Sequence, residues 1–385
     1  MAENIKVIGN SCVGCRSCEQ VCPVSCIDIR ANQEGFLYPV VDENKCISCG
    51  KCMRCCPVNN KELHRFQPQN VYALKNKDEV TIMNSASGGA GDLFATAILK
   101  KGGVVFGAAY DEKLHVHHIQ VDKIEDKAPL QSSKYVQSDT EHTYLRVKEL
   151  LANGKEVLFT GTPCQIAGLY SFLGGDQPGL FTVDLICHGV PSPKFFEKYI
   201  GDWNKRMDGK VIYYNFRSKE KRGWGTQYLL KTKTKTKTKT LSLDKYGQHF
   251  MAADCYRECC YECLYANTNR VGDVTVGDFW GISKSHPKFF SSKGVSSVFV
   301  NTEKGTRLLE AIKANTYIET ATLSEAMVKQ GNLVKPATRP SSRNYFYNHL
   351  EDKNFITNMR VGIRVQDRIK ALIPSVVIRE LKKLS

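Results

Sequence analysis

The chain has 385 residues, 42% of them hydrophobic, which is enough to bury more than one core, so two or three domains are expected. Its 54 Lys and Arg against 39 Asp and Glu give a formal net charge of +15, which favours an acidic partner, an anionic cofactor or an anionic membrane surface. An integral membrane protein is excluded because no apolar run approaches the roughly eighteen residues of a spanning helix. Nucleic-acid binding is not predicted because no helix-turn-helix, RRM or zinc-finger pattern is present.

Two cysteine runs of identical spacing stand near the N-terminus. Each reads C-x2-C-x2-C-x3-C-P, the spacing that holds [4Fe-4S] clusters in two-cluster ferredoxins. In such domains the fourth cysteine of each run binds the cluster of the other run, because the proline after it turns the chain away. One predicted cluster is therefore held by Cys12, Cys15, Cys18 and Cys56, and the other by Cys46, Cys49, Cys52 and Cys22.

Zinc and disulfides are the alternatives for these cysteines. A zinc site generally uses paired C-x-x-C hooks rather than two identical four-cysteine runs. Disulfides need an oxidising compartment, and the first ten residues have charges and no long apolar core of a signal peptide, so a reducing cytoplasm is expected. Cys26 and Cys55 fall outside the spacing and are predicted to be packing residues.

Residues 1–66 are predicted to form this two-cluster domain. Between the two runs, segments 27–30 and 36–40 are expected to be strands of a hairpin joined through Gly35. A linker over 64–70 follows.

From Val71 the pattern becomes that of a mixed α/β domain, predicted to extend to residue 335. Residues 85–89 are expected to open a helix that runs to about Lys101, and a buried strand is expected over 104–110. The small residues at the helix start either form an ordinary cap or leave backbone N–H groups free for a phosphate.

A strand over 114–121 carries His115, His117 and His118. Alternation puts His118 on the opposite face from the other two, and no carboxylate is spaced to join them, so a structural role is predicted rather than a metal site. The polar segment 132–138 is predicted to be a cofactor-binding loop, and a structural helix is expected over 140–152.

Two further cysteines follow predicted strands. Cys164 lies between a strand over 157–160 and a helix that ends near residue 173, and Cys187 follows a strand over 180–186. Ligands bind α/β sheets at the ends of such strands, so the two cysteines are expected to lie close together.

Five Lys-Thr repeats occupy residues 231–240. Alternation would put every Lys on one face of an extended strand, which is typical of a solvated sheet edge. An anion-binding strip is the alternative.

A third group of cysteines, Cys255, Cys259, Cys260 and Cys263, precedes the segment 270–281. Cys260 and Cys263 form a C-x-x-C hook that needs partners. A third cluster is predicted on Cys164, Cys187, Cys260 and Cys263. The local alternative uses all four cysteines of the group, but adjacent cysteines rarely both bind one metal.

Helices over about 303–314 and 324–330 are expected to close the domain. Residues 336–385 contain ten Lys and Arg against four Asp and Glu and are predicted to form a basic helical tail. Its apolar side could dock on the protein's own domain, on a partner or on an anionic membrane surface.

Taken together, these stretches resemble the beta subunits of coenzyme F-420 hydrogenases and dehydrogenases. The likeness rests, in this order, on residues 85–89, 102–110, 133–138, 161–165, 184–193 and 260–281, and it covers about residues 1–335. The resemblance implies a main domain that carries FAD together with a four-iron cluster. The family includes enzymes that pass ferredoxin electrons to pigments, and bacterial members that accompany polysaccharide-synthesis proteins.

The resemblance also implies where FAD binds. The pyrophosphate is expected at the helix start near Gly88, and Lys134 is the candidate catalytic residue, with a charge near the phosphates or the ring. The implied cofactor-binding residues are Ser87, Gly88, Gly89, Ser133, Lys134, Tyr135, Thr162 and Gln165.

The predicted fold class is α+β: an N-terminal two-[4Fe-4S] ferredoxin-like domain, a mixed α/β domain with FAD and a third cluster, and a helical C-terminal tail. The expected function is that of an iron–sulfur flavoprotein oxidoreductase, in the cytoplasm or peripherally at the inner membrane surface. It would pass electrons from an acidic ferredoxin or similar donor to an organic substrate, with FAD supplying the chemistry. The alternative is an electron-transfer subunit of a larger oxidoreductase complex, of the coenzyme F-420 type or another, without a small-molecule substrate.

Overall fold

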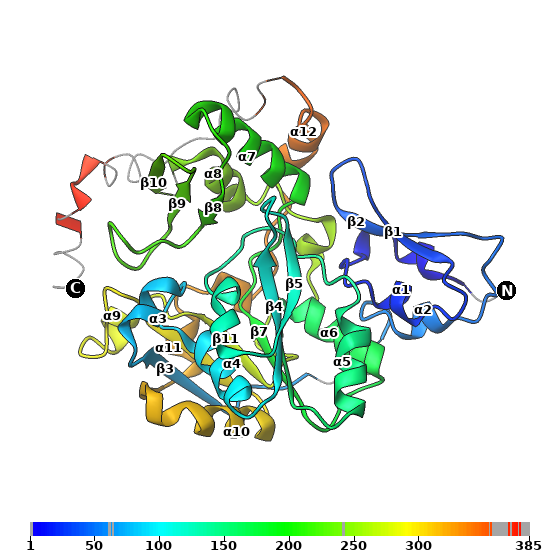
Figure 1. The fold of residues 1–385 in the computed structure, drawn as a ribbon, viewed down its shortest axis with the longest axis horizontal. Helices are drawn as coiled ribbons and strands as arrows, with labels where there is room; N and C mark the ends of the chain where they lie inside the picture. The colour runs from blue at the N-terminus through cyan, green and yellow to red at the C-terminus, as the bar shows by residue number, and fades with distance from the viewer. Residues whose placement is uncertain are drawn as a thin grey trace.

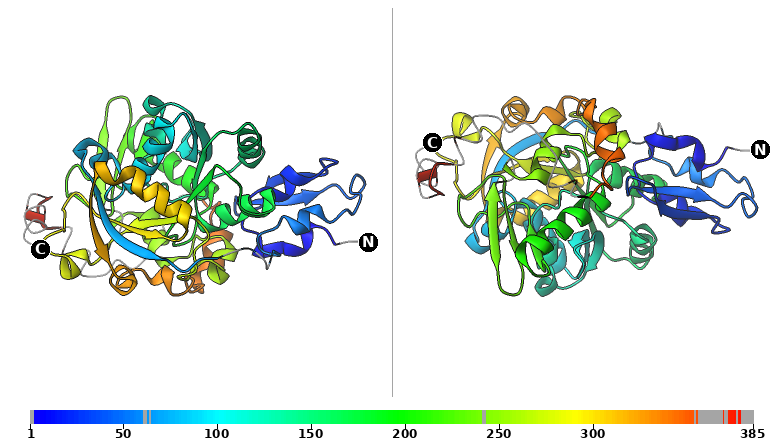
Figure 2. Two further views of the ribbon diagram at one scale, coloured as in Figure 1. Left: turned by 90° about the horizontal axis from the view of Figure 1, so that it is seen from below. Right: turned by 90° about the horizontal axis from the view of Figure 1, so that it is seen from above.

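The computed structural model describes residues 3–60, 63, 65–240, 243–353, 355, 369, 372–375, 377 and 378. An N-terminal module projects from one side of a larger α/β body (Figure 1). Two further views show the same projection, with the N-terminus at the far end of the module (Figure 2). Among the described residues, none of the helices has the length and apolar character needed to span a membrane.

The N-terminal module consists of short elements around a two-stranded hairpin. Strand β1 (Ile27–Ala31) pairs antiparallel with β2 (Leu37–Val41), and Gly35, with a φ of +86°, lies in the connection. The predicted hairpin is therefore confirmed. The helical elements are η1 (Ile5–Ser11), α1 (Ser17–Val21) and α2 (Lys51–Arg54).

An eight-stranded sheet forms the centre of the larger body, in the order β13-β3-β12-β11-β7-β6-β4-β5. The four central strands, β11, β7, β6 and β4, are parallel, and the other neighbours are antiparallel. The strands are β3 (Asn70–Asn76), β4 (Val104–Tyr110), β5 (Val116–Val121), β6 (Val157–Gly161), β7 (Leu180–Leu185), β11 (Val274–Asp278), β12 (Ser296–Val300) and β13 (Thr316–Ala321).

Helices cover both faces of this sheet, which is why its inner strands are nearly continuous apolar runs. In β6, Leu158 belongs to the core under α4 (Ala90–Lys100) and α10 (Glu303–Ile312). Its neighbours Val157 and Phe159 belong to the core under α5 (Thr143–Ala152) and α6 (Pro163–Leu173). Side chains that alternate along a strand point to opposite faces, so the two cores lie on opposite sides. Shorter helices are α3 (Glu79–Asn84), α9 (Ile282–Ser285) and α11 (Leu323–Met327).

A second, smaller assembly is packed around aromatic side chains, at the top of Figure 1. Its sheet has the order β10-β9-β8. Phe195, Phe196 and Tyr246 lie at its centre, with the Phe195 and Tyr246 rings stacked 4.6 Å apart. The elements are α7 (Pro193–Met207), β8 (Tyr213–Asn215), β9 (Gln227–Lys231), β10 (Thr236–Thr240), α8 (Lys245–Ala252) and α12 (Ser342–Asn348).

The Lys-Thr repeat differs from its prediction as one extended strand. Only its second half forms β10, which is the edge strand of this smaller sheet. The first half turns back, because the Thr232 hydroxyl accepts a hydrogen bond from the backbone N–H of Lys235 at 3.0 Å. Threonine side chains offer the backbone this alternative to a strand ladder.

The predicted C-terminal tail is described in part. Helix α12 packs Phe346 and Tyr347 into the aromatic core. Most of the tail after residue 353 lies outside the described residues.

Candidate iron–sulfur centres

Four thiols of the N-terminal module line one small cavity. They are three cysteines of the first run and the last of the second, Cys12, Cys15, Cys18 and Cys56, and we call this group the inner site. Gly14, with a φ of +71°, turns the backbone between the first two. Burial raises the pKa of Cys15 to about 12, and the neighbouring thiols add to the rise. Thiols bind metal as thiolates, so loading this site releases protons.

The remaining four cysteines of the runs, Cys22, Cys46, Cys49 and Cys52, are called the outer site. Cys49 is exposed at the surface. Cys26, buried beside it, has its Sγ 3.5 Å from that of Cys22. Cys26 and Cys55 are 5% and 4% exposed and belong to the core of the module.

Five cysteines from three segments line a cavity of about 500 Å³ in the larger body. We call it the third site. Cys164 is in the first turn of α6, and Cys187 follows β7. The others, Cys259, Cys260 and Cys263, come from η5 (Glu258–Glu262) and the residue after it. The sixteen cysteines are all free thiols, so the donor set suits a cluster that needs four thiolates.

The structure brings the predicted third-cluster ligands together and adds Cys259. Burial and then nearby thiols raise the pKa of Cys164 well above its ordinary value, and these thiols include Cys187, Cys263 and Cys259. Cys259 also raises the pKa of Cys187 and of Cys263, in each case after the larger effect of burial. Cys260 stays the fourth ligand predicted from sequence, and Cys259 is a second candidate.

A buried ion pair fixes the segments that carry these thiols. Asp184, three residues before Cys187, accepts a hydrogen bond of 2.9 Å from Arg270, which is 2% exposed. The same carboxylate accepts bonds from the backbone of Val271 and Gly272. The end of β7 and the chain beyond the C-x-x-C hook are thereby held together.

The inner site and the third site are direct neighbours. Asn10, Ser11 and Val13, around the first cysteine of the inner site, line the third-site cavity. The Ser17 hydroxyl donates to the carbonyl of Gly168 at 2.9 Å. Gly168 lies one turn after Cys164 on α6, about 6 Å along the helix axis.

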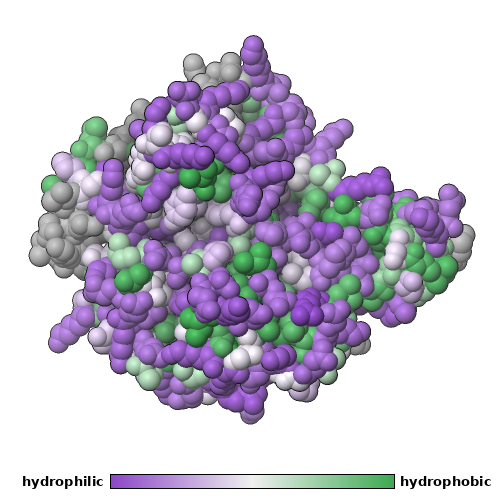
Figure 3. All heavy atoms as spheres, viewed as in Figure 1, coloured by the Kyte–Doolittle hydropathy of each residue, from purple (hydrophilic) through white to green (hydrophobic). Residues whose placement is uncertain are grey.

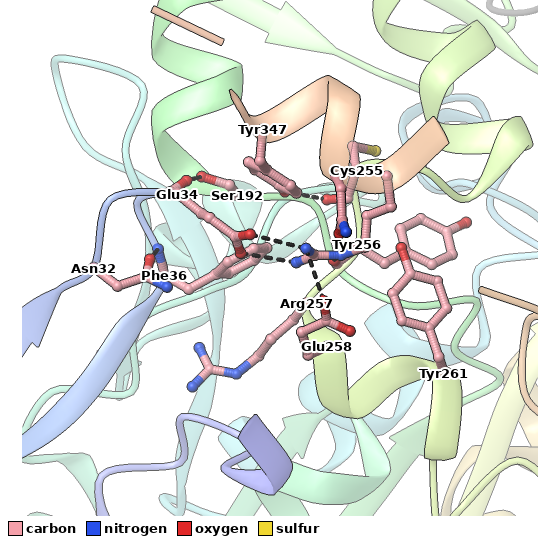
Figure 4. A network of polar contacts seen from close by, with 12 residues as sticks. Asn32, Glu34, Phe36, Ser192, Cys255, Tyr256, Arg257, Glu258, Tyr261 and Tyr347 are labelled. Carbon is pink, nitrogen blue, oxygen red and sulfur yellow. Dashed lines mark hydrogen bonds and ion pairs between the residues drawn. The ribbon is translucent and has the colours of Figure 1, made fainter. Parts of the chain in front are cut away.

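An ion-pair cluster holds the hairpin tip of the module against the larger body (Figure 4). Arg343 of α12, 1% exposed, donates to both Glu34 oxygens at 2.8 Å and pairs with Glu258 at 2.9 Å. The Ser192 hydroxyl donates to the Glu34 carbonyl. The module is therefore docked at α6 and at α12, and further contacts such as the 2.8 Å ion pair between Arg16 and Asp139 join it to the larger body.

The residues expected to bind the FAD phosphates are largely bonded within the chain. The backbone N–H of Gly88 donates to the Ser296 hydroxyl at 3.0 Å, and the Ser87 hydroxyl bonds the same group at 2.8 Å. A Cβ at Gly88 would come 2.2 Å from the carbonyl of Leu74. In this structure the Gly88 N–H is hydrogen-bonded to Ser296 of β12, and the phosphate site at this helix start stays a prediction. Gly89 serves as the N-cap of α4.

The other expected FAD residues are also engaged. Thr162 and Gln165 form the capping box of α6. The Lys134 ammonium donates to two backbone carbonyls at 2.7 and 2.9 Å, and burial lowers its pKa to about 7. The Tyr135 hydroxyl accepts from Arg217 at 2.9 Å. Ser133 is half-buried in the same loop.

Sequence reasoning missed a buried polar cluster beside residues 85–89. The Arg217 guanidinium donates to both Asp278 oxygens, at 2.8 and 2.6 Å, and to the Ala86 carbonyl at 3.0 Å. Lys219, 1% exposed, donates to the carbonyls of Ile82 and Ser87 at 2.6 Å. Asp278 lies in the segment 270–281 that carries the family resemblance, and that segment was the signal that could have pointed to it.

The three histidines of β5 and its preceding turn separate as alternation predicted. His118 is buried, with its ring nitrogens 2.8 Å from the Ser138 hydroxyl and 3.0 Å from the Thr160 carbonyl. His115 contacts Asp111, and His117 contacts Glu141. Within the described parts of the chain, no three His, Cys, Asp or Glu side chains are arranged to hold a single metal ion.

Comparisons with known proteins agree with the sequence motifs. Residues 154–326 match the family model for the C-terminal part of the beta subunit of coenzyme F420 hydrogenase/dehydrogenase. Two overlapping models of a 4Fe-4S dicluster domain match residues 11–60 and 38–88. These matches confirm the predicted relationship to this family and the predicted iron–sulfur domain.

Among solved structures, the xenon-derivatised F420-reducing [NiFe] hydrogenase complex from Methanosarcina barkeri contains a similar chain. It is 18% identical, with a TM-score of 0.49, and the match covers 70% of this chain and 90% of that one. No curated protein sequence matches this chain.

Proposed function

We propose that this iron–sulfur protein, related to the coenzyme F420 hydrogenase/dehydrogenase beta subunits over residues 154–326, is an oxidoreductase that carries single electrons through three [4Fe-4S] clusters. Electrons enter at the outer site, pass to the inner site and reach the third site. They leave to an organic acceptor, with FAD as the group that collects two of them.

One observation supports this order above the others: the inner site shares a wall with the third-site cavity. Val13, between two inner-site cysteines, lines that cavity together with Cys164 and Cys187. Cys15 and Cys164 both raise the pKa of the buried Tyr265, after the larger effect of its burial, so both thiols lie close to this one ring. Neighbouring clusters can exchange electrons without a mobile carrier.

The surface of the outer site suits an acidic protein donor. Lys45, Lys51 and Arg54 are exposed and lie close in sequence to the exposed Cys49. Ile47, 61% exposed, adds an apolar contact beside them. Hydrophobic residues are visible over the module surface in Figure 3. Opposite charges accelerate the encounter of such partners, so we propose an acidic ferredoxin or a similar one-electron carrier.

The proposal that this protein binds FAD is based on the family resemblance. When bound, it would supply the change from one-electron to two-electron chemistry. The donors expected for its phosphates are engaged within the chain, most clearly at Gly88, so no step of the reaction is derived through it. An organic substrate connected with polysaccharide synthesis is proposed on the same resemblance.

The second candidate is an electron-transfer subunit that passes charge to a partner enzyme and binds no small substrate. The internal bonding of Gly88, Thr162 and Gln165 favours this function, because it leaves fewer free donors for a cofactor.

Rapid mixing under anaerobic conditions tests the proposed order. The cluster-loaded chain is mixed with reduced ferredoxin, and cluster reduction is followed by visible absorption, with bound flavin assayed separately. In Cys164→Ser, the outer and inner sites should still be reduced, while electrons no longer reach an acceptor. Cys255→Ser is the matched control, since this buried thiol does not line the third-site cavity. Unchanged acceptor reduction in Cys164→Ser would refute the relay. A loaded chain without flavin that reduces only a partner protein would favour the second candidate.

A further inference from the structure

Arg257 lies where the N-terminal module meets the third site. It lines the third-site cavity, and its guanidinium reaches into the module. It donates to the carbonyl of Cys12 at 2.7 Å and to that of Leu37 at 2.8 Å, and it lies 4.0 Å over the ring of Tyr38. Its exposed fraction is 0%.

The guanidinium of Arg257 is not paired with a carboxylate among the described residues. A third oxygen acceptor, at 3.1 Å, is the amide oxygen of Gln137, and these three oxygens are neutral. The side chain also contacts the Cys259 thiol. The adjacent Glu258 pairs with Arg339 and Arg343 instead. This contrasts with other buried arginines of the described chain, for example Arg217 and Arg270, which face Asp278 and Asp184.

An unpaired buried charge is costly, by several kcal/mol per ion in general. Among the described residues, the groups that act most strongly on Arg257 and can become negative are the Tyr38 hydroxyl and thiols of two different cluster sites. These thiols are Cys12 of the inner site, and Cys259 and Cys260 of the third site. The missing counter-charge of the guanidinium is therefore supplied when thiolates and their clusters are present.

The fit of Arg257 against the inner site is close. Gly14, the residue between Cys12 and Cys15 that turns the cluster-binding loop, has no room for a side chain on this side. A Cβ there would lie 3.1 Å from Arg257 Nη1 and 2.6 Å from the Gln137 amide nitrogen. The charge thus sits directly on the loop that wraps the inner site.

We propose that Arg257 is a positioning residue for electrons: its buried positive charge stabilises the reduced state of both the inner-site and the third-site cluster and so raises both reduction potentials together. This inference rests on the proposed function, since it requires clusters at both sites. In the step concerned, one electron leaves the inner-site cluster and one is gained by the third-site cluster. Arg257 stays protonated, so no proton moves.

Redox titration of the loaded chain, followed by electron paramagnetic resonance, tests this inference. In Arg257→Gln, the equilibrium constant for reducing the inner and third clusters should fall about tenfold or more, which for a one-electron couple is about 59 mV toward negative potential. The outer-site cluster should keep its potential. Arg343→Gln is the matched control, because it removes a buried arginine of the same interface that is already paired with Glu34 and Glu258. It should leave the three potentials in place.

A second variant keeps Arg257 and neutralises its charge. Gln137→Glu puts a carboxylate where the amide oxygen lies 3.1 Å from Nη1, and it should lower the same two potentials. If Arg257→Gln does not fold, this variant still tests whether the charge of Arg257 raises the two potentials.

Three results would overturn the inference. The first is that the inner and third clusters keep their potentials in Arg257→Gln or in Gln137→Glu. The second is that all three clusters shift equally in these variants, and the third is that Arg343→Gln shifts the potentials as much as Arg257→Gln does. Iron analysis of the unaltered chain comes first. If the chain holds only two clusters, the proposed function fails because there is no third cluster in the relay. If the chain holds three clusters and their potentials do not change in the variants, only the inference about Arg257 fails.

Discussion

Cys15 of the inner site packs directly against Gly168 of α6, so closely that a Cβ on this glycine would lie 2.7 Å from the Cys15 Cβ and 2.8 Å from its Sγ. A helix interior ordinarily gains about 1 kcal/mol when Gly is replaced by Ala. Here the added methyl group must push the cluster loop away, and overpacking costs about 1–3 kcal/mol. We therefore expect Gly168→Ala to lower the anaerobic melting temperature and to release iron from the inner site.

Gly201 of α7 is the matched control for this substitution, because a Cβ there meets nothing within 4 Å. Gly201→Ala should keep all its iron and melt at the same temperature or higher. If Gly168→Ala were stabilised as much as Gly201→Ala, the contact between Cys15 and Gly168 would not be tight.

Iron content separates the candidate ligands of the third cluster. Three clusters of four irons give about twelve irons per chain, and loss of one ligand set should leave about eight. Cys164→Ser, Cys187→Ser and Cys263→Ser should each lose the third cluster, because these thiols share one cavity. Comparison of Cys259→Ser with Cys260→Ser then identifies the fourth ligand, which is the cysteine whose replacement loses the third cluster. Retention of all twelve irons in both would contradict a cluster built on η5.

The rate of reduction by an acidic ferredoxin should fall with salt and with loss of charge at the outer site. Ions screen such attraction over about 10 Å at 0.1 M and about 3 Å at 1 M. Replacing Lys45, Lys51 and Arg54 by Gln should slow the reaction several-fold at low salt. The control replaces Lys231, Lys233 and Lys237 of the Lys-Thr repeat, which are also exposed and change the net charge by the same amount. Equal slowing by both triple variants would show that only the total charge matters.

Stability should depend on pH through Lys219. Burial, followed by the nearby Arg217 charge, lowers the pKa of this lysine to about 7, whereas an unfolded lysine has a pKa of about 10.4. Between these values the unfolded chain binds a proton that the folded chain does not. The free energy of unfolding should therefore rise with pH in this window, by up to about 1.4 kcal/mol per pH unit.

Lys219→Met removes this contribution. The melting temperature of the unaltered chain minus that of the variant should increase from pH 7 to pH 9.5. Lys113→Met, at an exposed position, should show a difference that stays flat over the same range. A flat difference for Lys219→Met as well would mean that the buried amine keeps its ordinary affinity for protons.

The parts of this protein that sequence could predict are those fixed by local spacing. The hairpin through Gly35 and the apolar strand at Val157 are set by neighbouring residues. The cysteine runs indicate clusters because ligand spacing within a loop is local as well. The prediction for the Lys-Thr repeat was only partly right, since a hydroxyl of Thr232 competes with the strand ladder.

The parts that could not be predicted depend on partners far away in sequence. The N–H of Gly88 is taken by Ser296, 208 residues later. Arg257 contacts Cys12 across 245 residues, and nothing around it in the sequence marks it as different from other arginines. The aromatic assembly around Tyr246 likewise arises from elements that meet only in the folded chain.

The ion pair between Glu34 and Arg343 spans 309 residues of chain. Synthesis at about 5–20 residues per second means that the hairpin tip emerges roughly 15–60 s before its partner. Until α6 is made, the inner-site thiols are not yet pressed against Gly168, and iron–sulfur donors can reach them. Once α12 is made as well, the ion pair fixes the hairpin tip of the same module. The order of biosynthesis therefore favours insertion of the inner cluster before the chain is complete. A finished chain that loses its inner cluster has to undock its module before a new cluster can be inserted.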